Sequence, residues 1–562
     1  MAYSPDDVRA WIEHDPDPQT AAELAALLET AEAGDGQAQA ELDSAFSGPL
    51  TFGTAGLRGR MGAGETRMNR AVVRRAAAGL VSYLKEKVGN DALLVIGYDA
   101  RYHSADFAAD TAAIAAAAGI RAQIMPRTLP TPLLAYAVRK LDADAGVMVT
   151  ASHNPAADNG YKVYLGGRCA DEAGKGVQLV SPADSEIAAL IAAAPPADEI
   201  PLAEGYETID ETLIDSYIDE TAALIPAGFT SNLPIVYTAM HGVGAETMRK
   251  LFAKAGFTNV TEVAEQCEPD PDFPTVPFPN PEEDGALNMA IEKARVSGAQ
   301  LVIASDPDAD RCSIAIPNGE GWRQLSGDEI GSILGEYLAE HIPPATQNPT
   351  FASSIVSSRL LSKIAEAHEL GYAGTLTGFK WIARTENLVY GYEEAIGFCV
   401  NPEAVRDKDG MSAALLLAHI AHLQNTRGEG LQDVLDRLYI KHGVYLSAPV
   451  TLRVDDLAII PATMARVRAT PPATLAQSAI VSSIDLNDGS QALGLPPSDV
   501  VMWYTEKNDR VVVRPSGTEP KVKCYLEVYV PVECPEALAE AKLAAAHRMD
   551  VLKKDVAAAL GM

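Results

Sequence analysis

The chain is predicted to be an α/β protein of several domains, with a separate α+β domain at its C-terminal end. Apolar, strand-like runs alternate with helix-like segments over most of its length, which is the pattern of largely parallel sheets. At 562 residues the chain is too long for one hydrophobic core and is expected to divide into roughly three to five domains. After about Val444, short β-like runs and an alanine-rich helix from Pro535 replace the alternation and indicate the separate domain.

Two stretches show the alternation in order. Each reads as strand, helix and strand: residues 92–100, 105–119 and 145–149, and then residues 233–242, 245–256 and 301–304. A further helix is expected from Gly327, where apolar residues recur at helical spacing. Residues 193–201 and 267–284 are rich in proline and acidic residues and are expected to be linkers or long loops. The recurring order indicates repeated α/β domains.

The charge and the cysteines exclude several classes of partner and site. A formal net charge of −31 repels nucleic acid and anionic membranes, so neither is an expected partner, and any phosphorylated ligand needs cations gathered locally. The six cysteines form no C-x-x-C pair, which argues against a zinc ribbon or a disulfide framework. The N-terminus lacks a signal peptide and the alanine-rich run 111–120 is too short to span a bilayer, so a cytoplasmic location is expected.

The motif TASHNP at residues 150–155 places a serine on a loop directly after a strand-like run. Such a serine can carry a phosphoryl group in a phosphoryl-transfer enzyme. Ser152 and His153 are neighbours in the chain, which is a poor arrangement for the nucleophile and base of a hydrolase. A simple turn is the alternative, because Asn154 precedes a proline. Lys162 is a candidate general acid/base or, alternatively, a solvated surface lysine.

Three carboxylates follow the strand-like run 301–304, in the motif SDPDADR. Asp306, Asp308 and Asp310 are two residues apart, and in an extended loop this spacing puts all three on one side. Three oxygen ligands suit Mg²⁺ and leave room for a phosphate oxygen. A calcium-binding EF-hand loop is excluded, since Arg311 stands where glycine is required and Pro317 where glutamate is required. The alternative is an acidic loop exposed to solvent.

Cations recur in four short segments. They are Arg58 and Arg60 in TFGTAGLRGR, Lys380 in TGFKWIAR, Lys408 in RDKDG, and Arg514 and Lys521 in RPSGTEPK. The glycines of the first segment allow the backbone to approach an anion closely, although a structural turn explains them equally well. The last segment also contains Ser516, Gly517 and Thr518 and is a candidate phosphate clamp.

Paired carboxylates occur in GYEEAIGF, at Glu393 and Glu394. Such a pair could serve as the acid and base of a glycosidase. Adjacent residues of a strand face opposite sides, however, so at most one of the two is expected to face a ligand. Hydrogen bonding to sugar hydroxyls is the more economical role for that residue.

In this order, the motifs resemble those of the α-D-phosphohexomutase superfamily, from about Thr51 to Tyr529. The resemblance implies three related α/β domains with mixed parallel sheets, followed by an α+β domain similar to the TATA-binding-protein fold. The implied boundaries are 1–228, with an N-terminal helical extension, then 229–323, 324–444 and 445–562.

The resemblance also implies roles for the residues quoted above. Ser152 would be the phosphoserine and, with Asp306, Asp308 and Asp310, would hold one Mg²⁺ per chain. Arg58 and Lys162 would assist proton transfer and charge neutralisation, with His153 close by, and Arg311 would be a further catalytic residue. The sugar and its phosphate would be bound by ten residues: Thr377, Gly378, Lys380, Glu393, Lys408, Arg514, Ser516, Gly517, Thr518 and Lys521.

The implied reaction is a mutase reaction on sugar phosphates. Phospho-Ser152 would donate to a hexose monophosphate, most naturally glucose 1-phosphate or 6-phosphate, and glucose 1,6-bisphosphate would be the intermediate and activator. The sugar loop reads YEEA, with Ala395 in place of the serine of GEES or GEMS, as in the phosphoglucomutase-2 and phosphopentomutase-like branch. Pentose or mannose phosphates are therefore alternatives, and a phosphatase or a non-catalytic sugar-phosphate binder lies outside the class. The expected partners are small sugar phosphates, and the expected protein is a monomer or homodimer.

Overall fold

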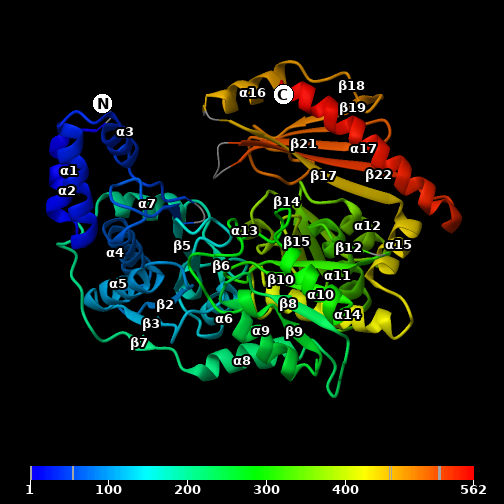
Figure 1. Cartoon of the computed structure of the whole chain (residues 1–562), viewed down its shortest axis with the longest axis horizontal. Coiled ribbons are helices and arrows are strands. Elements are labelled where there is room, and N and C mark those ends of the chain that lie inside the picture. The colour runs from blue at the N-terminus through cyan, green and yellow to red at the C-terminus, as the bar shows by residue number, and fades with distance from the viewer. Residues whose placement is uncertain (1–2, 54–55, 320, 455, 457, 517–520) are drawn as a thin grey trace. The chain divides into compact units, whose positions relative to one another are not determined.

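The computed structural model describes the chain except for residues 1–2, 54–55, 320, 455, 457 and 517–520 (Figure 1). The chain forms two compact units. Unit 1 comprises Met1–Gln324 and Gly397–His422, and unit 2 comprises Leu325–Ile396 and Leu423–Met562. Among the described residues, no helix combines the length and the apolar character needed to cross a membrane.

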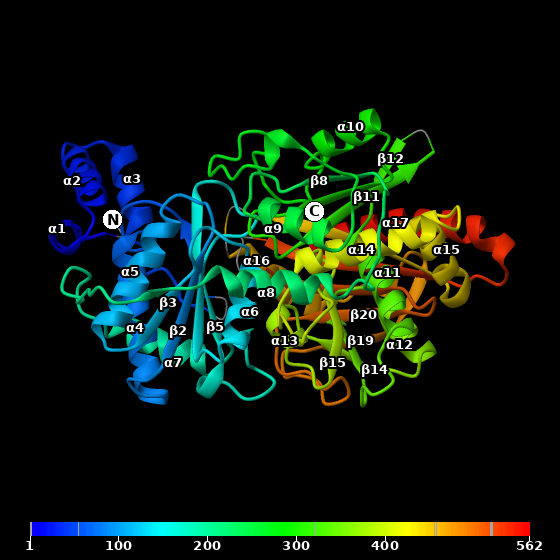
Figure 2. The same cartoon turned by 90° about the horizontal axis from the view of Figure 1, so that it is seen from below.

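Unit 1 begins with three helices, α1 (Pro5–His14), α2 (Pro18–Glu32) and α3 (Gly36–Ala45). The side chains of Asp17 and Asp35 accept backbone N–H groups at the starts of α2 and α3, which satisfies donors left free at a helix N-terminus. The three helices share a small core of their own, in which Trp11 and Phe46 meet edge to face at 6.0 Å. Figure 2 shows them beside α4 and α5 of the first sheet.

The first sheet has seven strands in the order β1-β5-β4-β2-β3-β7, with β6 paired to β5. The strands are β1 (Leu57–Arg60), β2 (Leu93–Tyr98), β3 (Arg121–Ile124), β4 (Ala145–Val149), β5 (Asp158–Leu165), β6 (Val177–Gln178) and β7 (Glu207–Thr208). The helices are α4 (Arg70–Lys87), α5 (Ser104–Ala117), α6 (Thr131–Lys140), α7 (Ala183–Ala192) and α8 (Glu211–Ala222), with a short 3-10 turn η1 (Gly167–Cys169). The central strands β2, β3 and β4 pair in parallel, and β4 is wholly apolar because both its faces are covered.

The second sheet of unit 1 has the order β12-β11-β10-β8-β9. Its strands are β8 (Ile235–Thr238), β9 (Val260–Glu262), β10 (Leu301–Ser305), β11 (Cys312–Asn318) and β12 (Gly321–Gln324). The β10/β8 and β8/β9 pairs are parallel, whereas β10/β11 and β11/β12 are antiparallel. Helices α9 (Gly244–Lys254), α10 (Asn288–Ser297) and α14 (Gly410–Asn425), the turn η2 (Ala264–Gln266) and the strand β16 (Gly397–Cys399) complete the elements of this part of the chain.

Unit 2 begins with three parallel strands in the order β14-β13-β15, which are β13 (Thr350–Ser354), β14 (Gly371–Thr375) and β15 (Leu388–Glu393). Its helices here are α11 (Gly327–Glu340), α12 (Leu360–Ala367), α13 (Phe379–Ile382) and α15 (Leu431–His442). Helix α11 starts at a capping box in which Ser326 and Glu329 bond each other's backbone N–H groups, as expected from serine and glutamate at this spacing.

The C-terminal sheet is antiparallel throughout its pairs, in the order β17-β22-β21-β20-β19-β18. The strands are β17 (Val444–Arg453), β18 (Thr474–Leu475), β19 (Ser478–Asp485), β20 (Val501–Thr505), β21 (Arg510–Pro515) and β22 (Lys521–Val530). In the chain, helix α16 (Ile459–Ala469) lies between β17 and β18, and the turn η3 (Pro535–Ala537) follows β22. The long helix α17 (Leu538–Leu560) packs on β17 and β22 (Figure 1).

The predicted fold class is confirmed. Mixed α/β sheets precede an α+β segment whose change in pattern begins at β17. The strand, helix and strand expected at 92–100, 105–119 and 145–149 correspond to β2, α5 and β4. The four domain boundaries remain a prediction.

Candidate active site

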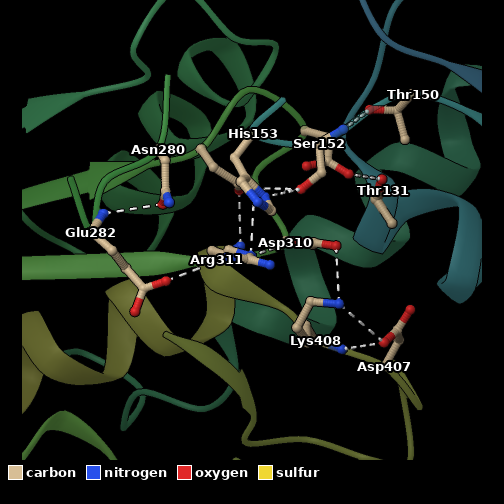
Figure 3. Close-up of polar contacts among 12 residues, drawn as sticks. Thr131, Thr150, Ser152, His153, Asn280, Glu282, Asp310, Arg311, Asp407 and Lys408 are labelled. Atoms are coloured by element: carbon tan, nitrogen blue, oxygen red, sulfur yellow. Dashed lines mark hydrogen bonds and ion pairs between the residues drawn. The ribbon is translucent and has the colours of Figure 1, made fainter. Parts of the chain in front are cut away.

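Ser152 lies in the turn that follows β4, and its side chain is directed at the acidic loop. The residue is 3% exposed and has a backbone φ of 51°, which is a left-handed conformation that costs free energy for a residue with a β-carbon. Its N–H donates to Thr150 Oγ1 at 2.9 Å. Its hydroxyl lies 3.2 Å from His153 Nδ1 (Figure 3). The same hydroxyl donates to Asp306 Oδ2 at 2.9 Å. The turn suggested by the sequence is therefore present, and it serves to aim the hydroxyl.

The acidic loop follows β10 and is fully buried, which excludes the solvent-exposed loop considered above. One oxygen atom from each of Asp306, Asp308 and Asp310 lies within 4.8 Å of the others. Among the described residues, Asp308 Oδ1 and Asp310 Oδ1 are buried without a hydrogen-bond partner. Buried carboxylate oxygens without partners are costly, and a hard divalent cation such as Mg²⁺ satisfies them. The donor set therefore fits a Mg²⁺ ion.

Hydrogen bonds from Thr131 and Arg311 hold the acidic loop in place. Thr131, at the start of α6, donates its hydroxyl to Asp308 Oδ2 at 2.6 Å and its N–H to the Asp308 carbonyl at 2.9 Å. The Arg311 N–H donates to Asp306 Oδ1 at 3.0 Å. These bonds fix two of the three carboxylates before any ligand arrives.

Two lysines neutralise the carboxylates. Lys162 Nζ lies 2.7 Å from Asp308 Oδ2 and 3.0 Å from Asp310 Oδ2, and Lys408 Nζ lies 3.2 Å from Asp310 Oδ2 (Figure 3 shows Lys408). The side chain of Lys162 is 7% exposed, so the alternative of a solvated surface lysine is wrong. The loop of Lys408 is held by Asp407, which accepts from Tyr164 Oη at 2.7 Å.

Burial and neighbouring charges shift the pKa values of the aspartates and of Lys162 in this cluster. Burial and the two neighbouring aspartates raise the pKa of Asp306 well above its ordinary value. Burial also acts to raise the pKa of Asp310, but Lys162, Lys408 and Arg311 outweigh it and the net pKa is lowered. Burial acts to lower the pKa of Lys162, yet Asp308 and Asp310 outweigh that effect and the net pKa is raised. Lys162 is therefore held as a cation.

His153 and the arginines complete this part of the site. Burial, together with Arg311 and Arg58, lowers the pKa of His153 well below its ordinary value, so the imidazole is neutral. Arg58 donates to Asn154 Oδ1 at 3.3 Å. The Arg311 side chain lies 3.6 Å from Glu282 Oε2 (Figure 3) and 4.0 Å from Asp306 Oδ2. A neutral base and two guanidinium groups therefore adjoin the serine and the carboxylates.

The predicted sugar loop lies in unit 2. Gly378 has φ 110°, a conformation suited to glycine, and its N–H donates to Glu393 Oε1 at 2.7 Å, which connects the TGFK and YEEA segments. Lys380 lies 5.7 Å above the ring of Trp381, and Thr377 is half-buried in the bend before Gly378.

The two adjacent glutamates make different contacts. Glu394 Oε2 accepts from Ser354 Oγ at 3.0 Å and from Ser357 Oγ at 2.8 Å, within unit 2. Glu393 instead accepts the N–H of Gly378. The two carboxylates therefore lie in different surroundings, and the expectation that at most one of them faces a ligand stays a prediction.

The predicted phosphate clamp connects β21 to β22 in the C-terminal sheet. Arg514 lies near the end of β21, and the Ser516 N–H donates to the Lys521 carbonyl at 2.8 Å where β22 begins. Lys521 is buried. Gly517 and Thr518 lie outside the described residues.

Several residues at the site were not singled out from sequence. Thr131 donates a hydrogen bond to Asp308, and Glu282 lies beside Arg311. Asp407 accepts the backbone N–H of Lys408. Arg101 contacts the serine loop through its backbone carbonyls. Only Asp407 carried a signal, because it belongs to the RDKDG segment; the others approach the site through the fold alone.

Comparison with known proteins matches four family profiles in chain order. They are described as phosphoglucomutase/phosphomannomutase alpha/beta/alpha domains I, II and III and C-terminal domain, and they match residues 49–195, 215–319, 326–442 and 452–544. Together they span most of the chain.

Individual relatives carry different substrate names. A Haemophilus influenzae protein described as a probable phosphomannomutase is 45% identical over 465 residues, covering 82% of this chain and 93% of the relative. A Schizosaccharomyces pombe protein described as a probable phosphoribomutase is 33% identical and covers 92% of each chain. A Staphylococcus haemolyticus phosphoglucomutase is 34% identical, covering 88% of this chain and 93% of the relative.

Proposed function

The chain belongs to the phosphoglucomutase/phosphomannomutase family and is a phosphohexomutase-type isomerase, and from this premise we propose its substrate and mechanism. The proposed reaction interconverts glucose 1-phosphate and glucose 6-phosphate through a phosphorylated Ser152 and glucose 1,6-bisphosphate. The observation that carries the proposal is the 2.9 Å contact from Ser152 Oγ to Asp306, within a cluster that retains two buried carboxylate oxygens without a hydrogen-bond partner among the described residues.

Asp306, Asp308 and Asp310, with the Ser152 oxygen, are the proposed ligands of one Mg²⁺ ion. When bound, this ion supplies charge neutralisation for the transferring phosphoryl group. The family supports a magnesium site, and the donor set described above fits one.

The proposed roles of the cations follow from their contacts. Lys162 is held as a cation between Asp308 and Asp310, so it is assigned to charge neutralisation rather than to proton abstraction. Arg58 and Arg311 adjoin the same loop and are proposed to stabilise negative charge on the phosphoryl oxygens. Lys408 has a contact to Asp310 and is proposed to reach the substrate as well.

His153 is the proposed proton acceptor for Ser152. Its imidazole is neutral and its Nδ1 lies 3.2 Å from the serine hydroxyl, within reach of a proton transfer. When Ser152 takes a phosphoryl group from the bisphosphate, its hydroxyl proton passes to this nitrogen, and the sugar oxygen released from phosphorus takes up a proton from solvent. In the reverse step, the sugar hydroxyl attacks phospho-Ser152 and loses its proton to solvent, while the imidazolium returns its proton to Ser152 Oγ as the bond from phosphorus to that oxygen breaks.

The residues of unit 2 are proposed to bind the sugar and the phosphate that does not react. Glu393, with Thr377, Gly378 and Lys380, would bind sugar hydroxyls. Arg514, Ser516, Gly517, Thr518 and Lys521 would hold the phosphate, and the same clamp must accept a phosphate from either end of the sugar. Reorientation of glucose 1,6-bisphosphate between the two transfers is part of the proposal.

The family description names both glucose and mannose, which differ at one carbon; glucose is the proposed sugar and mannose the nearest alternative. A phosphopentomutase is the second candidate function, since a relative covering 92% of the chain is described as a phosphoribomutase and Ala395 interrupts the hexose-type loop. The enzyme is proposed to act in the cytoplasm on small sugar phosphates, as a monomer or homodimer.

Turnover of glucose 1-phosphate, mannose 1-phosphate and ribose 1-phosphate, with Mg²⁺ and a trace of glucose 1,6-bisphosphate, tests the proposal. The highest kcat/KM is expected for glucose 1-phosphate. A dominant ribose rate would reassign the substrate to pentose phosphates. Steady release of inorganic phosphate without isomerisation would indicate a phosphatase, and binding without turnover a sugar-phosphate binder.

A further inference from the structure

Arg101 makes an unusual set of contacts with the loop that carries the reactive serine. Its Nη1 donates to the carbonyls of Pro155 at 2.8 Å and Asp158 at 3.0 Å. Its Nη2 donates to the carbonyls of Ser152 at 2.7 Å and Asn154 at 2.6 Å. One guanidinium group thus ties four backbone carbonyls of a seven-residue segment, including that of Ser152 itself.

The guanidinium group of Arg101 also contacts the carboxylate of Asp99 and the ring of Phe273. Its Nε lies 3.5 Å from Asp99 Oδ2, and both side chains are 1% exposed. Asp99 Oδ1 accepts from Ser104 Oγ at 2.7 Å and from the Arg101 N–H at 3.0 Å. The ring of Phe273 lies 5.0 Å from the guanidinium carbon and covers it.

This arrangement is costly for stability alone. Burial raises the pKa of Asp99 and lowers that of Arg101, so each charge is disfavoured by desolvation. A buried ion pair is often no better for stability than apolar residues of the same volume. Stability alone therefore does not explain the contacts of Arg101, and their effect on the conformation of the serine loop is the explanation to consider.

The loop has a conformation that needs support. Ser152 has φ 51°, and a left-handed serine persists only where its surroundings hold it. The carbonyl of that residue is one of the four that Arg101 binds. We infer that Arg101 is a positioning residue for phosphoryl transfer, holding the serine loop so that Ser152 Oγ stays beside Asp306 and His153.

The inference rests on the proposed role of Ser152 as the phosphoryl carrier, and it assigns Arg101 no contact with the sugar. Its side chain is 1% exposed, and its guanidinium group donates hydrogen bonds to backbone carbonyls of the serine loop. Loss of the clamp therefore lowers the rate of transfer and leaves substrate binding unchanged.

The planar shape of arginine matters here. Two separate nitrogens each span two carbonyls, whereas the single ammonium of lysine is a point charge on a flexible stem. Arg101→Lys therefore keeps the positive charge opposite Asp99 and loses at least part of the clamp.

The test compares Arg101→Lys with Arg74→Lys. Arg74 is a matched control, because its side chain is 9% exposed and it binds the carboxylate of Asp110, at 3.0 and 3.2 Å, rather than the carbonyls of the serine loop. Arg74 lies in α4 and Arg101 in the segment that follows β2, so each variant removes one buried guanidinium group. For Arg101→Lys, kcat is expected to fall about 10- to 100-fold, with KM within about twofold of wild type, because a misplacement of roughly 1 Å is costly in rate.

For Arg74→Lys, kcat is expected to stay within about threefold of wild type, even if thermal stability falls as far as in the first variant. A wild-type kcat in Arg101→Lys would overturn the inference. An equal fall in Arg74→Lys would also overturn it, since the loss would then follow from general destabilisation.

Mass spectrometry after incubation with glucose 1,6-bisphosphate separates this inference from the proposed function. Wild-type enzyme that never gains phosphate on Ser152 would refute the phosphoserine mechanism. If wild type is phosphorylated there and Arg101→Lys turns over normally, only the positioning role falls. Should Arg101→Lys fail to fold, Asp99→Asn removes the counter-charge behind the guanidinium; a fall in kcat of about threefold or more with unchanged KM is expected, and a wild-type kcat would overturn the inference.

Discussion

The replacement Asp328→Asn is expected to remove a pH dependence of stability that originates in unit 2. Asp328 lies in the first turn of α11 and is buried, where it accepts from the Ser358 N–H at 2.7 Å, from Tyr392 Oη at 2.9 Å and from Ser447 Oγ at 2.5 Å. Burial outweighs these hydrogen bonds and raises the pKa of Asp328 from 3.8 to about 6.

The sign follows from proton linkage. A raised pKa means that the folded protein binds the proton more tightly than the unfolded chain does. The stabilising effect is complete below the ordinary pKa of 3.8 and is lost as the pH rises through about 6. At about 1.4 kcal/mol per pKa unit, the full effect of this group is about 3 kcal/mol, and about 2 kcal/mol of it falls between pH 4.5 and 7.

The assay is urea denaturation of wild type and Asp328→Asn at several pH values between 4.5 and 8, followed by tryptophan fluorescence, to which Trp381 and Trp503 contribute from unit 2. Asparagine keeps the shape and can accept from Ser358 while donating to Ser447. The free energy of unfolding of the variant, relative to that of wild type, should rise by about 2 kcal/mol as the pH increases from 4.5 to 7. Glu506→Gln, at an exposed carboxylate of the same unit, is the control. A difference between wild type and Asp328→Asn that does not change with pH would refute the reasoning.

Three further predictions concern the site. Ser152→Ala should abolish both turnover and phosphorylation by glucose 1,6-bisphosphate with little change in circular dichroism, and wild-type activity in it would remove the phosphoserine from the mechanism. Asp308→Asn should weaken Mg²⁺ binding at least tenfold in calorimetry, because Asp308 Oδ1 is a buried oxygen without a partner among described residues; unchanged affinity would place the metal elsewhere. Glu394→Gln should change the ratio of glucose to ribose kcat/KM by about threefold or more, since Glu394 belongs to the predicted sugar loop and its hydrogen bonds to Ser354 and Ser357 hold that loop, and an unaltered ratio would count against this role of Glu394.

Local patterns were sufficient for the main chemical groups of the site. The serine after β4 and the aspartates after β10 were predicted because each follows an apolar strand and because residues two apart share one side of an extended loop. Ser152 and Asp306 are 154 positions apart, and only the carboxyl-end placement of two strands in neighbouring sheets brings them to 2.9 Å. The resemblance supplied this pairing, since no periodicity of the sequence contains it.

Other features had no local signal. Sequence placed Lys408 among substrate contacts, whereas the structure shows its ammonium at Asp310, because the 406–410 loop is anchored in unit 1 by Tyr164 and Asp407. Whether Lys408 also reaches the substrate stays a prediction. The alternative contacts of Glu393 and Glu394 were likewise decided by which serines and amides surround them.

The sequence alone determined the fold class, the position of the serine and the composition of the acidic cluster, because strand periodicity, turn residues and carboxylate spacing act over a few neighbouring residues. The tertiary structure decided which charges meet. Arg101 reaches Ser152 across 51 positions, Thr131 reaches Asp308 across 177, and Lys162 reaches Asp308 across 146. Contacts over such separations depend on how sheets and helices pack, and the protonation of each buried group then depends on the neighbours that packing provides.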